Sequence, residues 1–126
     1  MWNDYFLHDM GAITHVNNEK SMVILGDSLE ILKTIRSESV DLIFTDPPYN
    51  INKDFGNNID KWSSKEAYVK WCYTWLDECM RILKPNGTMY FMTATQHMAY
   101  LDVYMSEKYN VLSRIIWSYD SSGVQS

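Results

Sequence analysis

Cysteines are scarce in this sequence, and their spacing argues against both a disulfide and a bound metal. The 126-residue chain contains two, Cys72 and Cys79, in a segment whose apolar residues repeat with helical spacing. About two helical turns would separate these side chains by roughly 10 Å, which is farther than a disulfide spans. The pair matches no zinc-finger or zinc-ribbon spacing, and the three histidines are scattered along the chain. We therefore expect reduced thiols and no metal site.

Long apolar runs and an excess of positive charge are also missing. No run approaches the roughly 20 apolar residues of a membrane span, and the first residues, Met1 to Asp4, carry no basic segment of an export signal. These absences predict a cytoplasmic protein that does not enter a membrane. Sixteen acidic residues against eleven basic ones give a net charge of −5. Because affinity for phosphates comes from Lys and Arg, a protein of this kind that acts on DNA should carry most of its phosphate-binding surface elsewhere.

What the sequence does contain is a regular alternation of predicted strands and helices. Four short apolar runs predict strands, at 22–25, 41–45, 88–93 and 111–117. Apolar residues at helical spacing predict three helices: one that Ser28 can cap, one over 64–83, and one around Met98 to Met105. Residues 1–21 are polar and are interpreted as an arm outside the main fold. This order predicts an α/β fold with a mostly parallel sheet and helices on both faces.

The segment Asp46-Pro47-Pro48-Tyr49 follows the second predicted strand directly. Ligands of parallel sheets bind beyond the carboxyl ends of the strands, so this segment and Asp27, which follows the first strand, are expected to be neighbours. The prolines fix two φ angles and remove two N–H donors, which leaves a stiff loop that presents carbonyl acceptors. Asp46 adds carboxylate oxygens and Tyr49 a flat ring. Together they suit a planar ligand whose exocyclic amine donates two hydrogen bonds while its ring stacks.

This tetrapeptide, followed by Asn50, resembles the catalytic motif of the DNA amino-methyltransferases. The resemblance extends to Gly26-Asp27-Ser28 before the motif, and to Leu83–Thr88 and Ile115–Trp117 after it. It implies a partial Rossmann-like methyltransferase sheet. It also implies transfer of a methyl group to N6 of an adenine that has been flipped out of double-stranded DNA.

The resemblance assigns a role to each residue of the motif. Asp46 and the Pro47 carbonyl would accept the two hydrogens of the adenine amine, in a loop that Pro48 helps to stiffen. Tyr49 would stack on the flipped base, a contact of roughly 1–3 kcal/mol. These bonds favour a tetrahedral nitrogen that attacks the methyl group directly, so neither a covalent intermediate nor a metal is needed.

Four further residues are expected to border the base pocket: Asn50, Phe55, Trp117 and Tyr119. Each also has an interpretation without a direct role. Asn50 and Phe55 would then only shape the loop, and the other two would be ordinary core or edge aromatics.

The expected cofactor is S-adenosylmethionine, with Asp27, Ser28 and Asp46 as its binding residues. Asp27 would contact the adenine end of the cofactor, or it would act only as a helix N-cap. The family also carries a glycine-rich Phe-x-Gly-x-Gly turn beneath the methionine part of the cofactor. This turn is absent from the sequence, in which the five glycines are all isolated.

In one circularly permuted class of the family, the target-recognition region and the glycine-rich turn follow the catalytic half. The sequence matches that order, so we expect an N-terminal fragment that is inactive alone. Residues 1–21 would be an arm, 22–120 the catalytic half, and 121–126 the start of a truncated recognition region. An incomplete sheet leaves apolar surface uncovered, which predicts self-association, and the class is often dimeric.

Two alternatives stay open. An N4-cytosine DNA methyltransferase shares the fold and the mechanism, although such enzymes more often begin the tetrapeptide with Ser, so Asp46 favours adenine. The alternative of another class is a non-catalytic protein that binds a partner or forms half of a split enzyme. Outside the motif, Glu78 and Arg81 are expected to form a surface ion pair across one helical turn.

Overall fold

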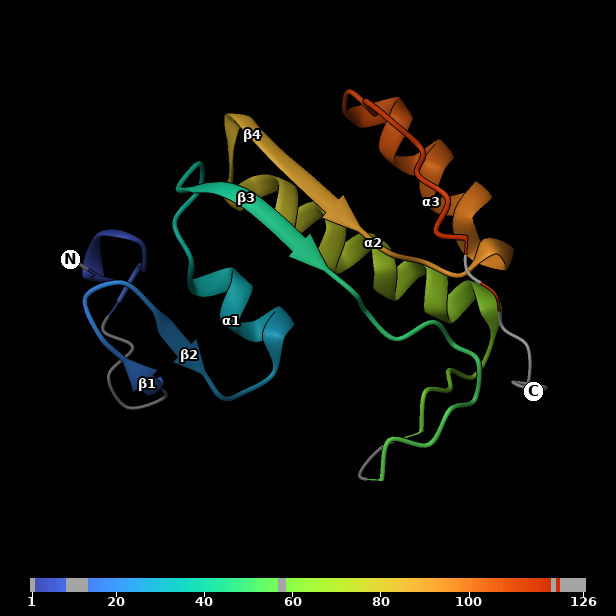
Figure 1. Cartoon of the computed structure of the whole chain (residues 1–126), viewed down its shortest axis with the longest axis horizontal. Helices are drawn as coiled ribbons and strands as arrows, with labels where there is room; N and C mark the ends of the chain where they lie inside the picture. Colours follow the sequence, from blue (N-terminus) through green and yellow to red (C-terminus); the bar gives the residue numbers. More distant parts are fainter. Residues whose placement is uncertain (1, 9–13, 57–58, 119, 121–126) are drawn as a thin grey trace.

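Strands and helices alternate along most of the chain (Figure 1). The computed structural model describes residues 2–8, 14–56, 59–118 and 120. In chain order the elements are the 3-10 helix η1 (Trp2–Asp4), β1 (Thr14–Asn17), β2 (Met22–Ile24), α1 (Ser28–Thr34), β3 (Val40–Thr45), α2 (Lys65–Ile82), β4 (Leu83–Phe91) and α3 (Thr95–Lys108). The described residues therefore form a mixed helix and strand fold with a parallel sheet, as the alternating pattern predicts.

β3 and β4 form the parallel pair, and α2 connects them as a β-α-β unit. Their register runs from Leu42 opposite Thr88 to Thr45 opposite Phe91. β4 begins five residues earlier than the predicted strand, and the register is irregular where its first residues face β3. Because the two strands run in the same direction, their carboxyl ends lie at one edge of the sheet. That edge is where the Asp46 loop leaves β3.

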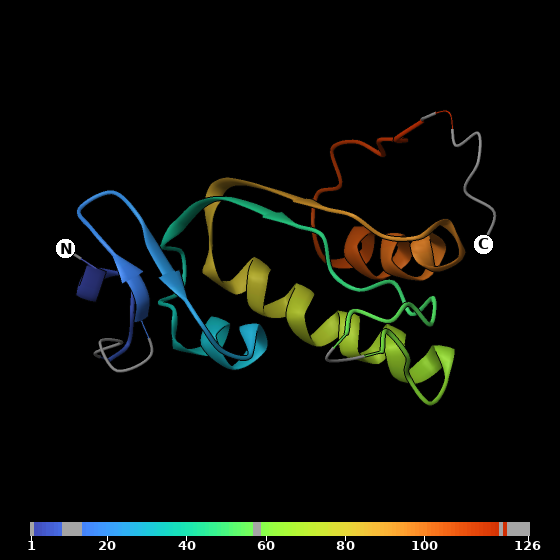
Figure 2. The same cartoon turned by 60° about the horizontal axis from the view of Figure 1, so that its bottom comes forward.

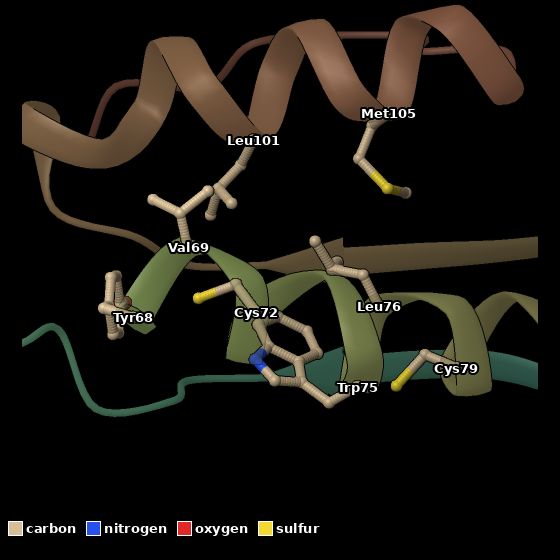
Figure 3. Close-up of a cluster of buried hydrophobic side chains, with 8 residues drawn as sticks. All are labelled: Tyr68, Val69, Cys72, Trp75, Leu76, Cys79, Leu101 and Met105. Carbon is tan, nitrogen blue, oxygen red and sulfur yellow. The ribbon is translucent and has the colours of Figure 1, made fainter. Parts of the chain in front are cut away.

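α2 supplies most of the core, as its apolar stripe predicts. The Ser64 side chain caps the helix by accepting a hydrogen bond of 3.0 Å from the Ala67 N–H. Buried side chains recur at helical spacing along one face of α2 and meet Leu101 and Met105 of α3 (Figure 3). Both cysteines lie in this core as free thiols. Burial raises the pKa of the Cys79 thiol to about 11, so the thiol is protonated and unreactive at neutral pH.

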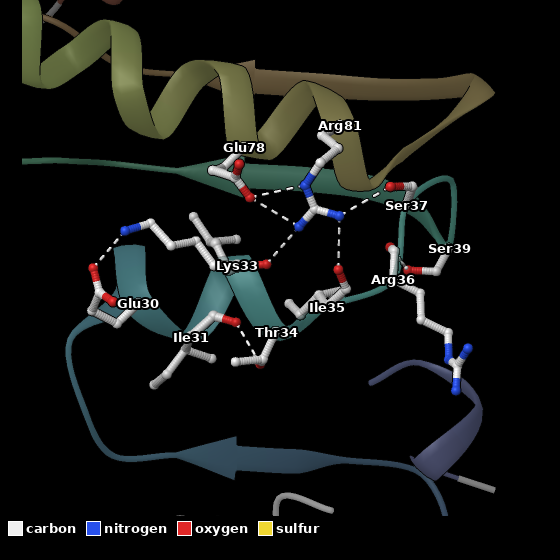
Figure 4. Close-up of polar contacts among 11 residues, drawn as sticks. Glu30, Ile31, Lys33, Thr34, Ile35, Arg36, Ser37, Ser39, Glu78 and Arg81 are labelled. Atoms are coloured by element: carbon white, nitrogen blue, oxygen red, sulfur yellow. Dashed lines mark hydrogen bonds and ion pairs between the residues drawn. The ribbon is translucent and has the colours of Figure 1, made fainter. Parts of the chain in front are cut away.

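Arg81 joins the end of α2 to the end of α1 (Figure 4). The predicted ion pair with Glu78 is present at 2.9 Å. The same guanidinium also donates to the carbonyls of Leu32 and Ile35, both at 2.9 Å, and to the Ser37 hydroxyl at 3.0 Å. Leu32 lies in the last turn of α1 and Ile35 is its C-cap, and the Leu32 carbonyl also accepts the Ile35 N–H at 3.0 Å. The ion pair expected from spacing is thus part of a larger contact between two helices.

β2 pairs with β1 and not with β3, so the prediction that 22–25 belongs to the parallel sheet is wrong. β1 and β2 are antiparallel, with Asn17 opposite Met22 and Thr14 opposite Ile24. Asn18 makes the tight connection, because its side chain accepts the N–H groups of Lys20 and Ser21 at 2.8 and 2.9 Å. β1 in this hairpin lies within residues 1–21, the segment that was predicted to be an arm.

Residues 111–117 form no strand, which contradicts the fourth predicted strand. Residues 110–118 are all described, and they run as irregular chain after α3. Arg114 ties this segment to α3 through two hydrogen bonds to the Asp102 carboxylate, at 2.6 and 2.7 Å. The apolar alternation suits a strand, but no neighbouring strand in the described residues pairs with it.

Helices cover only one face of the β3–β4 pair in the described part of the chain. α2 lies beneath the pair (Figure 2), where Ile43 and Met89 pack against its core. On the other face Leu42, Phe44 and Tyr90 are 60, 69 and 47% exposed. The expectation of helices on both faces is therefore wrong for these residues, while the expected uncovered apolar surface is present. Among the described residues, none of the helices has the length and apolar character needed to cross a membrane.

Candidate functional site

The Asp46 loop forms one wall of a pocket of about 450 Å³ next to the carboxyl end of β3. The pocket is lined by the four residues of the motif and by six residues of the chain that follows: Ile51, Lys53, Phe55, Ile59, Asp60 and Trp62. Its volume lies within the range of roughly 300–1,000 Å³ that is usual for sites that bind small molecules. The structure thus brings the predicted catalytic residues and Phe55 together in one cavity.

Asp46 and Tyr49 are in direct contact across the two prolines. The Tyr49 hydroxyl donates a short hydrogen bond to Oδ1 of Asp46. The pKa of Tyr49 is raised to about 12, mainly by burial and then by this bond to a carboxylate. The phenol is therefore neutral at physiological pH, and the ring is held beside the carboxylate. An acceptor and an aromatic face are placed side by side, as a planar ligand with an amine requires.

The loop is attached to α2 through Tyr68. The Tyr68 hydroxyl donates a hydrogen bond of 2.8 Å to the Pro48 carbonyl. Tyr68 is fully buried, and burial is the main cause that raises its pKa, so it stays a donor at any ordinary pH. The Trp62 ring meets it edge-on, with ring centroids 4.9 Å apart. A rigid helix therefore fixes the middle of the motif.

The chain beyond the motif folds back onto it through Asp60. The Asp60 carboxylate, in a residue that is 4% exposed, accepts the backbone N–H groups of Tyr49, Asn50 and Ile51 at 3.1, 2.6 and 3.2 Å. Asn50 has a left-handed φ of 57°, and its side-chain oxygen accepts the Trp62 N–H at 3.0 Å. The Asn50 side chain thus serves the shape of the loop and does not line the pocket.

The remaining predicted site residues lie outside this pocket or outside the described chain. The Asp27 carboxylate caps α1 by accepting the N–H groups of Leu29 and Glu30 at 2.9 and 3.2 Å. Ser28 is the first residue of α1 rather than its cap, which corrects the expected helix start. Trp117 is 74% exposed in the irregular segment after α3, and Tyr119 is not among the described residues.

Asp60, Trp62 and Tyr68 are the functional candidates that sequence reasoning missed. Asp60 stands in a polar loop in which nothing distinguishes it from Asp54. Tyr68 was predicted as part of the apolar stripe of α2, and it is buried there. The prediction did not include its hydrogen bond to the Pro48 carbonyl. A buried tyrosine needs a partner for its hydroxyl, and this requirement is the one signal that could have pointed to a second function. Among the described residues, no group of three or more His, Cys, Asp or Glu side chains is arranged to hold a metal ion.

Comparisons with known proteins place the chain in a family. A family model described as DNA methylase matches residues 40–126, which include the whole pocket. The DNA adenine methyltransferase YhdJ of Escherichia coli (strain K12) is 46% identical over 89% of this chain and 38% of its own length. The type II methyltransferase M.BamHI of Bacillus amyloliquefaciens is 35% identical over 84% of this chain and 23% of its own. For M.HpaI of Haemophilus parainfluenzae the values are 33%, 81% and 30%. The chain spans less than two fifths of these relatives.

Proposed function

The chain belongs to the DNA methylase family, and from this premise we propose that it carries the catalytic motif of a DNA adenine-N6 methyltransferase. The observation that carries the proposal is the contact of the Asp46 carboxylate with Tyr49 in a pocket beside the end of β3. The similarity to YhdJ, a DNA adenine methyltransferase, supports adenine as the substrate. In this proposal β3, α2 and β4 form part of a Rossmann-like methyltransferase fold, with β3 and β4 in its sheet. It keeps 1–21 as an arm, 22–120 as the catalytic half and 121–126 as the start of a recognition region.

The residues of the pocket act on the target base by orientation and by electrostatics. A flipped adenine would stack on the Tyr49 ring and direct its amine to the Asp46 carboxylate and the Pro47 carbonyl. The Tyr49 hydroxyl occupies one acceptor site of Asp46 Oδ1, and the carboxylate has further lone pairs for the amine. The two acceptors draw electron density towards the nitrogen and hold its lone pair in a fixed direction. Tyr68 keeps the adjoining Pro48 peptide in place while this happens.

The composition of the pocket fits S-adenosylmethionine, whose sulfonium is a cation. The Asp46 carboxylate and the rings of Tyr49, Phe55 and Trp62 line the same cavity, and both kinds of group stabilise a positive charge. The cofactor would supply an electrophilic methyl group. Asp46 would face it, and Asp27 and Ser28 are the further residues proposed for it, at the start of α1.

The proposed partner is double-stranded DNA with a flipped adenine, in a protein of the cytoplasm. The net charge of −5 places most phosphate contacts outside this chain. A homodimer is the proposed assembly, and it would use the uncovered face that carries Leu42, Phe44 and Tyr90. An exposed apolar face of this kind is typical of protein–protein contacts.

The test is to incubate the full natural protein with DNA and S-adenosylmethionine and to analyse the nucleosides. The expected product is N6-methyladenine. Asp46→Ala should abolish it with an unchanged circular dichroism spectrum, whereas Asp54→Ala, an exposed change in the same loop, should leave it intact. N4-methylcytosine would overturn the choice of adenine. No methylated base from a folded protein would favour a partner-binding or split-enzyme half.

A further inference from the structure

Asp60 is buried beneath the loop that follows the catalytic motif, although aspartate is rarely buried without a cation. Among the described residues no Lys or Arg forms an ion pair with it, and its carboxylate instead accepts three consecutive backbone N–H groups. We propose that Asp60 is a positioning residue that fixes Tyr49 for its contact with the target base. The inference rests on the proposed function for the identity of that base, and on geometry alone for the positioning.

The backbone around Asn50 is folded so that its N–H groups converge. Residues Tyr49, Asn50 and Ile51 direct these groups at one carboxylate, and the left-handed conformation of Asn50, with φ of 57°, makes this turn. Such a concave run of N–H groups is an anion-binding arrangement. Hydrogen bonds of this kind to a charged acceptor are stronger than those between neutral groups. The charge of Asp60 is therefore used to hold the peptides that follow the motif.

The loop brings Asp60 to this place by folding back on itself. The Asn52 N–H donates to the Asp60 carbonyl at 2.7 Å, and the Asp60 N–H donates to the Lys53 carbonyl at 2.8 Å. Asp54 and Ile59 form a further antiparallel bridge. The Asp60 backbone is thus paired with Asn52 and Lys53. This pairing leaves its side chain free to reach residues 49–51, where the loop begins.

The consequence is that Tyr49 is held from both directions along the chain. Upstream, the motif continues directly from β3, and Tyr68 holds the Pro48 carbonyl. Downstream, Asp60 holds the Tyr49 N–H itself. With its backbone fixed, the ring keeps its place beside Asp46. Small displacements of a reacting group reduce rates strongly, so the loss of Asp60 should affect turnover more than folding.

Asp60→Asn is the substitution that tests this, with Asp54→Asn as the matched control. An asparagine has the same size, but it offers one acceptor oxygen and turns an NH₂ group towards N–H donors. Asp54 lies in the same loop, is exposed, and its carboxylate accepts the N–H of Gly56. The control therefore makes the same chemical change without touching the motif.

The first readout is hydrogen exchange of single backbone amides, which needs no activity. In Asp60→Asn the amides of Tyr49, Asn50 and Ile51 should exchange at least roughly tenfold faster, because the NH₂ group takes the place of one acceptor oxygen and the remaining oxygen carries no charge. Amides in the middle of α2 should be unchanged, as should all of these amides in Asp54→Asn. Unchanged exchange at the three positions would overturn the proposal. If Asp60→Asn does not fold, rapid exchange of the three amides in the unaltered chain overturns it instead.

The second readout is methyl transfer by the full protein. Asp60→Asn should lower kcat by roughly tenfold or more, while KM for the cofactor and the melting temperature change little. Normal turnover together with faster exchange would show that Asp60 orders the loop but that this order does not affect catalysis. That result would overturn the positioning role. An unaltered protein that transfers no methyl group would refute the proposed function, and the exchange data would still decide whether Asp60 orders the motif.

Discussion

Replacing Arg81 with Ala should loosen α1 from α2 and leave the core of α2 intact. The substitution removes two hydrogen bonds of 2.9 Å to carbonyls at the end of α1, one of 3.0 Å to the Ser37 hydroxyl that follows, and the ion pair with Glu78. Hydrogen bonds from a charged donor contribute about 1.5–3 kcal/mol each when shielded. The Arg81 side chain is 31% exposed, so water replaces part of this. We expect a loss of about 2–4 kcal/mol in the free energy of unfolding, a large fraction of the total for a domain.

Denaturation by urea, followed by circular dichroism, measures this loss. Arg81→Lys should recover less than half of it, because one ammonium group cannot reach acceptors arranged for a planar fork. The control is Arg36→Ala, since the Arg36 side chain points away from the cluster (Figure 4); its effect should stay below about 0.5 kcal/mol. If Arg81→Ala costs no more than Arg36→Ala, the guanidinium does not hold the two helices together and the reasoning fails.

Three further changes test the core, the motif and the uncovered face. Leu76→Ala, at a fully buried side chain, should lower the free energy of unfolding by about 3–5 kcal/mol, whereas Ile116→Ala, at a side chain that is 90% exposed, should change it by less than about 0.5 kcal/mol; equal losses would contradict the assigned core. The pKa of Tyr49 is raised from 10.0 to about 12, so the unfolded chain loses this proton first as the pH rises. Its stabilising contribution is complete below pH 10 and is lost as the pH approaches about 12; the stability difference between Tyr49→Phe and the unaltered chain should vary in this window and be constant at lower pH. Phe44→Lys, on the face that α2 does not cover, should weaken self-association in sedimentation velocity without lowering the melting temperature; unaltered association would place the contact elsewhere.

The candidate site was predictable from the sequence only where its chemistry is local. Asp46 to Tyr49 follow an apolar run directly, and two prolines there allow few conformations. Asp60 could not be found in this way, because its role depends on a loop that returns to the motif. Asp54 makes the contrast plain: it is the same residue type in the same loop, yet it is exposed and accepts the N–H of its near neighbour Gly56.

By itself the sequence determined α2, its Ser64 cap and its buried stripe, because these depend on spacing within one element. It also determined that β3 ends at Thr45, directly before Asp46. Only the tertiary structure decided which strands pair. An apolar run has the same pattern whichever neighbour it joins, so β2 could pair with β1, and 111–117 could remain without a partner among the described residues. A strand forms only where a neighbouring strand shares its backbone hydrogen bonds. Which segment becomes that neighbour depends on the fold and not on the sequence of the strand itself.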